Sequence, residues 1–191
     1  NLYRFDGVSA ERVDVPLADA STLEAIFVTP SGDLWLGYAS GLTLVLPKGD
    51  FRHPRKLMGS APNSVEFLLD AKGTMWAMSA AGLYRYTTAG WHLVGADFGL
   101  PGKTTYSARP DTEGTLWVLN DNGVFSLDAD HQQFRRRDDV AAWLNQLQSK
   151  FKNDQSIRLK LYFCLDIVIL AAGKHLAQTF SSPSHNVFVD T

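Results

Sequence analysis

The chain has 191 residues, 18 Lys and Arg against 20 Asp and Glu, a formal net charge of −2 and a hydrophobic fraction of 45%. This composition is typical of a soluble globular protein and excludes disorder along the whole chain. The near balance of charges argues against a broad basic surface, so we expect no nucleic-acid partner. The single cysteine, Cys164, excludes an intrachain disulfide framework and a four-thiolate zinc site.

The chain opens at Asn1 without a visible targeting signal, and we expect it to be a piece of a longer protein. Its longest apolar stretch, residues 161–173, contains Asp166. A membrane-spanning helix needs roughly 20 apolar residues. The sequence therefore predicts no membrane insertion by this segment.

A unit with the pattern G-x-[LM]-W-x5-G-[LV] recurs three times at a step of 41 residues. Such strict phase is typical of a repeat architecture. Residues 2–5 match residues 83–86, so the chain opens within a fourth copy. The recurring positions are a first glycine (Gly32, Gly73, Gly114), a tryptophan (Trp35, Trp76, Trp117) and a second glycine (Gly41, Gly82, Gly123).

Each unit predicts four short strands in chain order. The first strands cover residues 23–28, 64–69 and 105–110, and each is followed by a four-residue turn that closes on the first glycine. The second strand carries the tryptophan and is apolar on consecutive positions, which is typical of a strand covered on both faces. The third strands follow the second glycine at residues 42–46, 83–86 and 124–127, and weaker fourth strands fall around Phe51, residues 91–94 and Phe134.

Four strands in about 41 residues predict a blade of a β-propeller. We therefore expect an all-β fold, a partial β-propeller with a short α/β or helical C-terminal appendage. The recurring tryptophans should pack between adjacent blades. The alternative is an antiparallel meander, which does not require strict phase.

The unit resembles the two-component regulator propeller repeat, whose pattern is D-x-x-G-x-L-W followed by G-L-Y-x-Y. Residues 70–76 and 82–86 match this pattern almost throughout, and the other two copies differ from it at one or two positions. The resemblance covers residues 1 to about 134. It implies a periplasmic or otherwise extracytoplasmic sensor domain of a bacterial signalling protein, with carbohydrate-derived ligands in some family members.

The resemblance also implies that this chain is not an enzyme and that its ligand-sensing role serves a histidine kinase or diguanylate cyclase output domain outside it. Two alternatives stay open, a propeller enzyme of the lyase or hydrolase kind and a protein–protein interaction scaffold. The innermost strands do not supply the cluster of acids or histidines that such an enzyme needs, because the equivalent positions are Glu24, Val65 and Tyr106.

The pattern stops near residue 135. Fourteen of the 15 glycines precede this point, and the next expected glycine and tryptophan are Gln155 and Arg158. We therefore divide the chain into propeller repeats over 1–134 and an unrecognised segment over 135–191, with a helix over 138–151 and a short strand over 187–189. The segment is a degenerate blade, a packing appendage or foreign sequence.

An open arc of blades leaves apolar faces at its two ends. We expect these faces to meet further propeller blades, a second copy of the chain or the C-terminal segment used as a plug. Of these we favour a fragment of a larger propeller, and we expect the isolated chain to be marginally stable or oligomeric.

Three histidines, His53, His92 and His131, recur every 39 residues. They fall in the outermost segments of successive blades, where neighbours diverge, whereas zinc ligands must converge within about 2.1 Å of one centre. We expect no metal site and no cofactor. The run of arginines at residues 135–137 is followed by two aspartates and is interpreted as a solvated hinge.

Two residues of the third copy depart from the repeat. Arg109 stands where the other copies have Phe27 and Leu68, and Tyr106 lies on the same strand. Polar and aromatic side chains near a propeller's central channel are suited to a small ligand. We therefore predict Tyr106 and Arg109 as ligand-binding residues, for a small molecule or a carbohydrate. The alternative is a degenerate blade that tolerates an exposed arginine.

Overall fold

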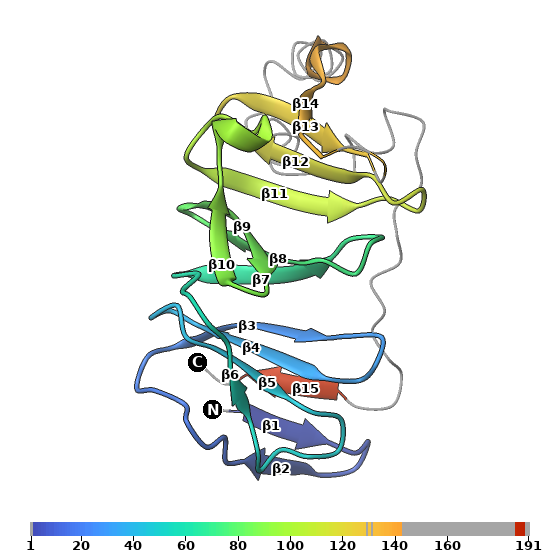
Figure 1. Ribbon diagram of the computed structural model, residues 1–191. Coiled ribbons are helices and arrows are strands. Elements are labelled where there is room, and N and C mark those ends of the chain that lie inside the picture. Colours follow the sequence, from blue (N-terminus) through green and yellow to red (C-terminus); the bar gives the residue numbers. More distant parts are fainter. Residues whose placement is uncertain (1, 129, 131, 143–185, 190–191) are drawn as a thin grey trace, which may run out of the picture.

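The computed structural model describes residues 2–128, 130, 132–142 and 186–189. These residues form four antiparallel sheets that succeed one another along the molecule (Figure 1). The second, third and fourth sheets each contain four strands in chain order, and the first contains three strands in the order β15-β1-β2. The predicted β-propeller blades are therefore confirmed.

The strand bounds follow the repeat. The first sheet contains β1 (Leu2–Phe5), β2 (Ala10–Val13) and β15 (Asn186–Val189). The second contains β3 (Leu23–Val28), β4 (Leu34–Tyr38), β5 (Thr43–Leu46) and β6 (Arg55–Lys56). The third contains β7 (Ser64–Leu69), β8 (Met75–Ser79), β9 (Gly82–Thr87) and β10 (Gly90–Val94). The fourth contains β11 (Thr105–Pro110), β12 (Leu116–Asn120), β13 (Gly123–Leu127) and β14 (Arg135–Arg136).

The three first strands, β3, β7 and β11, have the bounds that the sequence predicts. The fourth strand of the second sheet is different, because β6 lies at Arg55–Lys56 and not around Phe51. Pro47 and Asp50 form a turn there, in which the Asp50 N–H donates to the Pro47 carbonyl at 2.9 Å. Phe51 instead packs against the apolar cluster between the first and second sheets.

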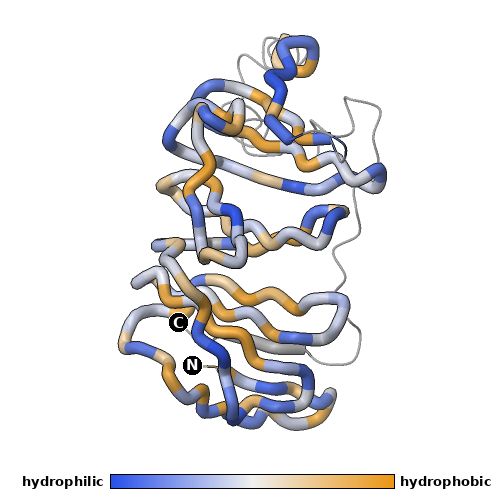
Figure 2. The backbone as a smooth tube through the Cα atoms, in the orientation of Figure 1, coloured by the Kyte–Doolittle hydropathy of each residue, from blue (hydrophilic) through white to orange (hydrophobic). Residues whose placement is uncertain are grey.

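The second strands form the centre of each sheet. Every residue of β4, β8 and β12 is buried, as their unbroken apolar runs predict. Hydrophobic stretches lie along β3, β4 and β5, and hydrophilic residues lie at the turns (Figure 2). Among the described residues, an apolar cluster lies at each junction between successive sheets.

The recurring tryptophans pack between sheets at two of the three positions. The ring of Trp35 contacts Tyr86 and Trp91 of the third sheet, at centroid distances of 5.7 and 6.4 Å. The ring of Trp76 contacts Phe134, which precedes β14, at 6.0 Å. Trp117 is fully buried on the outer face of the fourth sheet.

Identical spacing in the sequence conceals a difference in register. Trp35 is paired with Val45, whereas Trp76 is paired with Arg85 and Trp117 with Ser126. The loop from β4 to β5 is longer than the loops from β8 to β9 and from β12 to β13. At its ends, the Tyr38 N–H donates to the Leu42 carbonyl at 2.9 Å. A one-residue slip moves a strand's side chains to the opposite face. The side chains of β5 therefore lie on the opposite faces of their sheet from the equivalent side chains of β9 and β13.

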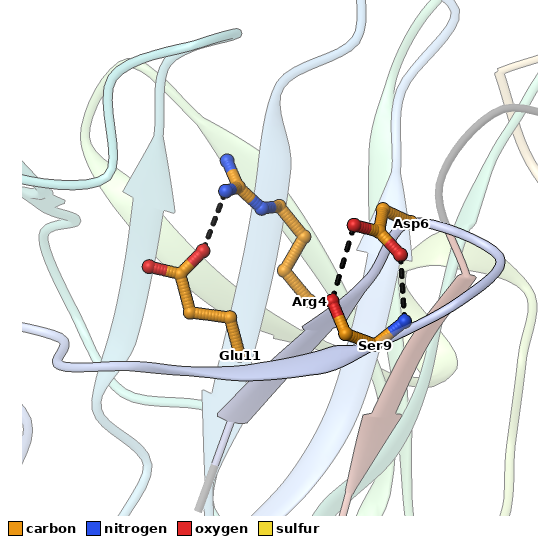
Figure 3. Close-up of polar contacts among 4 residues, drawn as sticks. All are labelled: Arg4, Asp6, Ser9 and Glu11. Atoms are coloured by element: carbon orange, nitrogen blue, oxygen red, sulfur yellow. Dashed lines mark hydrogen bonds and ion pairs between the residues drawn. The ribbon is translucent and has the colours of Figure 1, made fainter.

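The first sheet joins both ends of the chain (Figure 1). Leu2 to Phe5 of β1 pair with residues 186–189 on one side and with Val13 to Ala10 of β2 on the other. The strand predicted at 187–189 is thus confirmed. Across the β1–β2 hairpin, Arg4 donates to the carboxylate of Glu11 at 2.6 Å, and Asp6 accepts from the N–H and the hydroxyl of Ser9 (Figure 3).

The C-terminal segment begins differently from the predicted division. β14 at Arg135–Arg136 belongs to the fourth sheet, so this sheet extends two residues past the predicted boundary at 134. Residues 138–142 are helical, which agrees with the predicted helix start. The remainder of that predicted helix, 143–151, lies outside the described residues.

Candidate ligand site on the inner strands

The first strands of neighbouring sheets lie against one another, β3 against β7 and β7 against β11. Each of them contains a β-bulge at the same position of the repeat, at Glu24, Val65 and Tyr106. A bulge disrupts the ladder locally and redirects a side chain. Glu24 is exposed, and Tyr106 is 37% exposed although it is a large aromatic residue. At Glu24 and Tyr106 the bulge thus places a solvent-facing side chain on this edge of the sheets.

Arg109 lies on β11, three residues after Tyr106, and makes an ion pair with Glu66 of β7. Its Nη1 donates to the Glu66 carboxylate and, at 3.0 Å, to the carbonyl of Ala108. The side chains of Arg109 and Glu66 are 32% and 29% exposed. The ion pair therefore links the inner strands of the third and fourth sheets while both groups remain accessible to a ligand.

Glu66 is the residue that sequence reasoning missed. It stands where the other two copies have Ala25 and Ser107, and Arg109 stands where they have Phe27 and Leu68. Two positions of the repeat that lie two residues apart thus carry opposite charges in successive copies. The pair could have been found by comparing the charges at these two repeat positions between successive copies.

The chemistry of this site is that of polar recognition. The guanidinium supplies several N–H donors in a plane, the carboxylate supplies acceptors, and Tyr106 supplies an exposed ring. Because Glu66 compensates the charge of Arg109, the pair as a unit is close to neutral. The arrangement favours a ligand with both donors and acceptors over a simple anion.

Of the three recurring histidines, the structure describes His53 and His92. His53 contacts the carboxylate of Asp50 through Nδ1 at 2.9 Å, and this hydrogen bond lowers the pKa of Asp50 below its ordinary value. His92 is exposed on β10, and His131 lies outside the described residues. Among the described residues, no group of three or more His, Cys, Asp or Glu side chains is placed to hold a metal ion.

The four-stranded meanders, packed face to face through tryptophan wedges, define the chain as an array of β-propeller blades. No family model and no curated protein matches the sequence. No helix within the described residues is long and apolar enough to cross a membrane.

Solved structures share this fold. The extracellular domain of the proposed one-component system BT4673 from B. thetaiotaomicron matches with a TM-score of 0.55 at 19% identity, over 70% of this chain and 18% of that one. The extracellular domain of the proposed hybrid two-component system BT3049 from the same organism matches with a TM-score of 0.50 at 19% identity, over 63% of this chain and 17% of that one. YCF48 bound to D1 peptide matches with a TM-score of 0.51 at 14% identity, over 71% of this chain and 45% of that one.

The chain thus spans less than a fifth of the two signalling proteins' extracellular domains. The resemblance of the repeat to the two-component regulator propeller family agrees with these matches in fold.

Proposed function

We propose that this chain is a non-catalytic, ligand-binding part of an extracytoplasmic sensor module in a bacterial signalling protein, of the two-component kinase or diguanylate cyclase type. The observation that carries the proposal is the fold shared with two extracellular domains of signalling systems, BT4673 and BT3049. The motif over residues 70–86, which resembles the two-component regulator propeller repeat, supports the same class.

The ligand site of this proposal is the inner edge around Tyr106, Arg109 and Glu66. Arg109 and Glu66 come from different sheets, so a ligand that exchanges hydrogen bonds with either group also changes the contact between those sheets. That coupling gives a physical route from binding to a change in packing, which a sensor needs. The ligand class is a small molecule with donors and acceptors, carbohydrates included.

Binding screens against oligosaccharide and metabolite libraries test this function. We expect a saturable ligand whose binding is lost in Arg109→Ala and weakened in Tyr106→Ala. Arg4→Ala is the matched control, because Arg4 also makes an ion pair with a carboxylate but lies on the first sheet. Turnover of a library compound would contradict the sensor function and support a propeller enzyme. Binding confined to polypeptides would contradict the sensor function and support a protein–protein interaction scaffold.

A further inference from the structure

The recurring tryptophans differ in what covers them. Trp35 is covered by Tyr86 and Trp91 of the following sheet, and Trp76 by Phe134 of the following sheet. Trp117 belongs to the fourth sheet, yet it is fully buried. Its environment therefore shows how the outer face of this sheet is closed.

Arg137 lies on Trp117. Its guanidinium carbon is 4.8 Å from the centre of the indole ring, within the range of a cation–π contact. Its main-chain N–H donates to the Val124 carbonyl at 2.8 Å, which fixes the backbone on β13 directly after β14. Val140, in the helical turn that follows, is only 4% exposed.

Asp139 holds the guanidinium in place. Nε and Nη2 of Arg137 donate to the two carboxylate oxygens of Asp139, at 3.0 and 2.7 Å. Such a two-bond fork fixes the plane of the guanidinium as well as its position. The hydrogen bond raises the pKa of Arg137 and lowers the pKa of Asp139, so the pair stays charged.

We propose that Arg137, Asp139 and Val140 form an end cap on the fourth sheet. The cap occupies on Trp117 the place that aromatic side chains of the following sheet occupy on Trp35 and Trp76. Repeat arrays need a polar outer layer on their terminal unit to stay soluble. The cap thus prevents the apolar outer face of the fourth sheet from binding to a second copy of the chain.

A second copy is the partner because β1 carries residues that correspond in the repeat to the receptor of Trp35. Residues 2–5 of β1 repeat residues 83–86 of β9, so Tyr3 and Phe5 correspond to Tyr84 and Tyr86. Tyr84 and Tyr86 pack in the cluster that receives Trp35. With the cap removed, Trp117 of one copy faces residues on β1 of another that match its natural receptor, in a head-to-tail arrangement.

The experiment compares Arg137→Ala with Arg136→Ala. Arg136 is the matched control, because it also pairs with an aspartate, Asp138 at 2.7 Å, but its side chain is 58% exposed. We expect Arg137→Ala to speed hydrogen exchange of the Trp117 indole N–H about tenfold, measured by NMR, because a cation–π contact and an ion pair are lost together. Arg136→Ala should leave that exchange unchanged.

Sedimentation velocity gives the second readout. We expect Arg137→Ala to associate with rising concentration and Arg136→Ala to behave as the parent chain does. Adding Tyr3→Ser to Arg137→Ala should abolish the gained association. If Arg137→Ala does not fold, Arg137→Lys, which keeps the charge and loses the fork, provides the same comparison. Unchanged indole exchange would overturn the cap, and faster exchange without association would overturn the second copy as its partner.

Discussion

Trp76 donates its indole N–H to the carboxylate of Asp70 at 2.9 Å. The other oxygen of Asp70 accepts the main-chain N–H groups of Lys72 and Thr74, at 2.9 and 2.8 Å. Asp111 makes the same set of bonds to Glu113, Thr115 and Trp117. One aspartate thus fixes both the turn and the tryptophan wedge, which explains the spacing D-x-x-G-x-[LM]-W in physical terms.

The second sheet lacks this aspartate, and restoring it should stabilise the chain. Thr29 stands in its place, where its Oγ1 accepts the Asp33 N–H at 3.0 Å and shares a hydrogen bond with the Ser31 hydroxyl at 2.7 Å. We expect Thr29→Asp combined with Asp33→Thr, which recreates the pattern of the other copies, to raise the free energy of unfolding by about 1 kcal/mol over Asp33→Thr alone. Urea unfolding measures this difference. An unchanged midpoint of urea unfolding would show that a carboxylate at residue 29 does not stabilise Trp35.

Removing a wedge should cost far more than removing a surface aromatic residue. Trp76 is 1% exposed and contacts Phe134, so Trp76→Ala leaves a cavity between the third and fourth sheets. We expect a loss of roughly 3–5 kcal/mol in the free energy of unfolding. Tyr106→Ala is the comparison, because Tyr106 is 37% exposed, and it should cost much less. Equal losses in the two variants would contradict the wedge.

The ion pair between Glu66 and Arg109 should be weakly stabilising by itself. Both side chains are about a third exposed, and exposed pairs contribute about 0.2–1 kcal/mol. We expect a double-mutant cycle with Glu66→Ala and Arg109→Ala to give a coupling energy in that range, larger than the cycle for Glu11 and Arg4. Thermal unfolding at low and high salt checks the electrostatic origin. A coupling that is insensitive to salt would point to packing instead.

The pairing of Asp139 with Arg137 should be visible in an acid titration. The hydrogen bond lowers the pKa of Asp139 below its ordinary value of 3.8. A carboxyl whose pKa is depressed in the folded state contributes stability above its unfolded pKa, and that contribution is lost as the pH falls through the folded pKa. We expect the NMR titration of Asp139 to move up toward 3.8 in Arg137→Ala and to stay low in Arg136→Ala. A titration that moves equally in both variants would contradict the assigned pair.

The contact between the two ends of the chain should respond to proline. β15 lies at the edge of the first sheet, and alternate N–H groups of an edge strand point toward its neighbour. Of Val187→Pro and Phe188→Pro, we expect one to lower the thermal midpoint clearly more than the other, because only one removes a hydrogen bond to β1. Equal and negligible effects would show that β15 adds no stability to the first sheet.

The blades could be predicted from the sequence. Their turns depend on residues a few positions apart, such as Asp70 and Trp76, and their central strands on unbroken apolar runs, so both signals are local. Only part of the candidate site could be predicted. Arg109 departs from the repeat and was predicted, whereas Glu66 becomes its partner only because the third and fourth sheets pack together.

Three further features could not be predicted from the sequence. They are the slipped register of β5 against β4, the pairing of β15 with β1, and the placement of Arg137 on Trp117. Each depends on contacts between segments whose distance along the chain, or whose loop geometry, leaves no periodic trace in the sequence. Packing selects among such arrangements by the total area buried, which no short pattern of residues encodes.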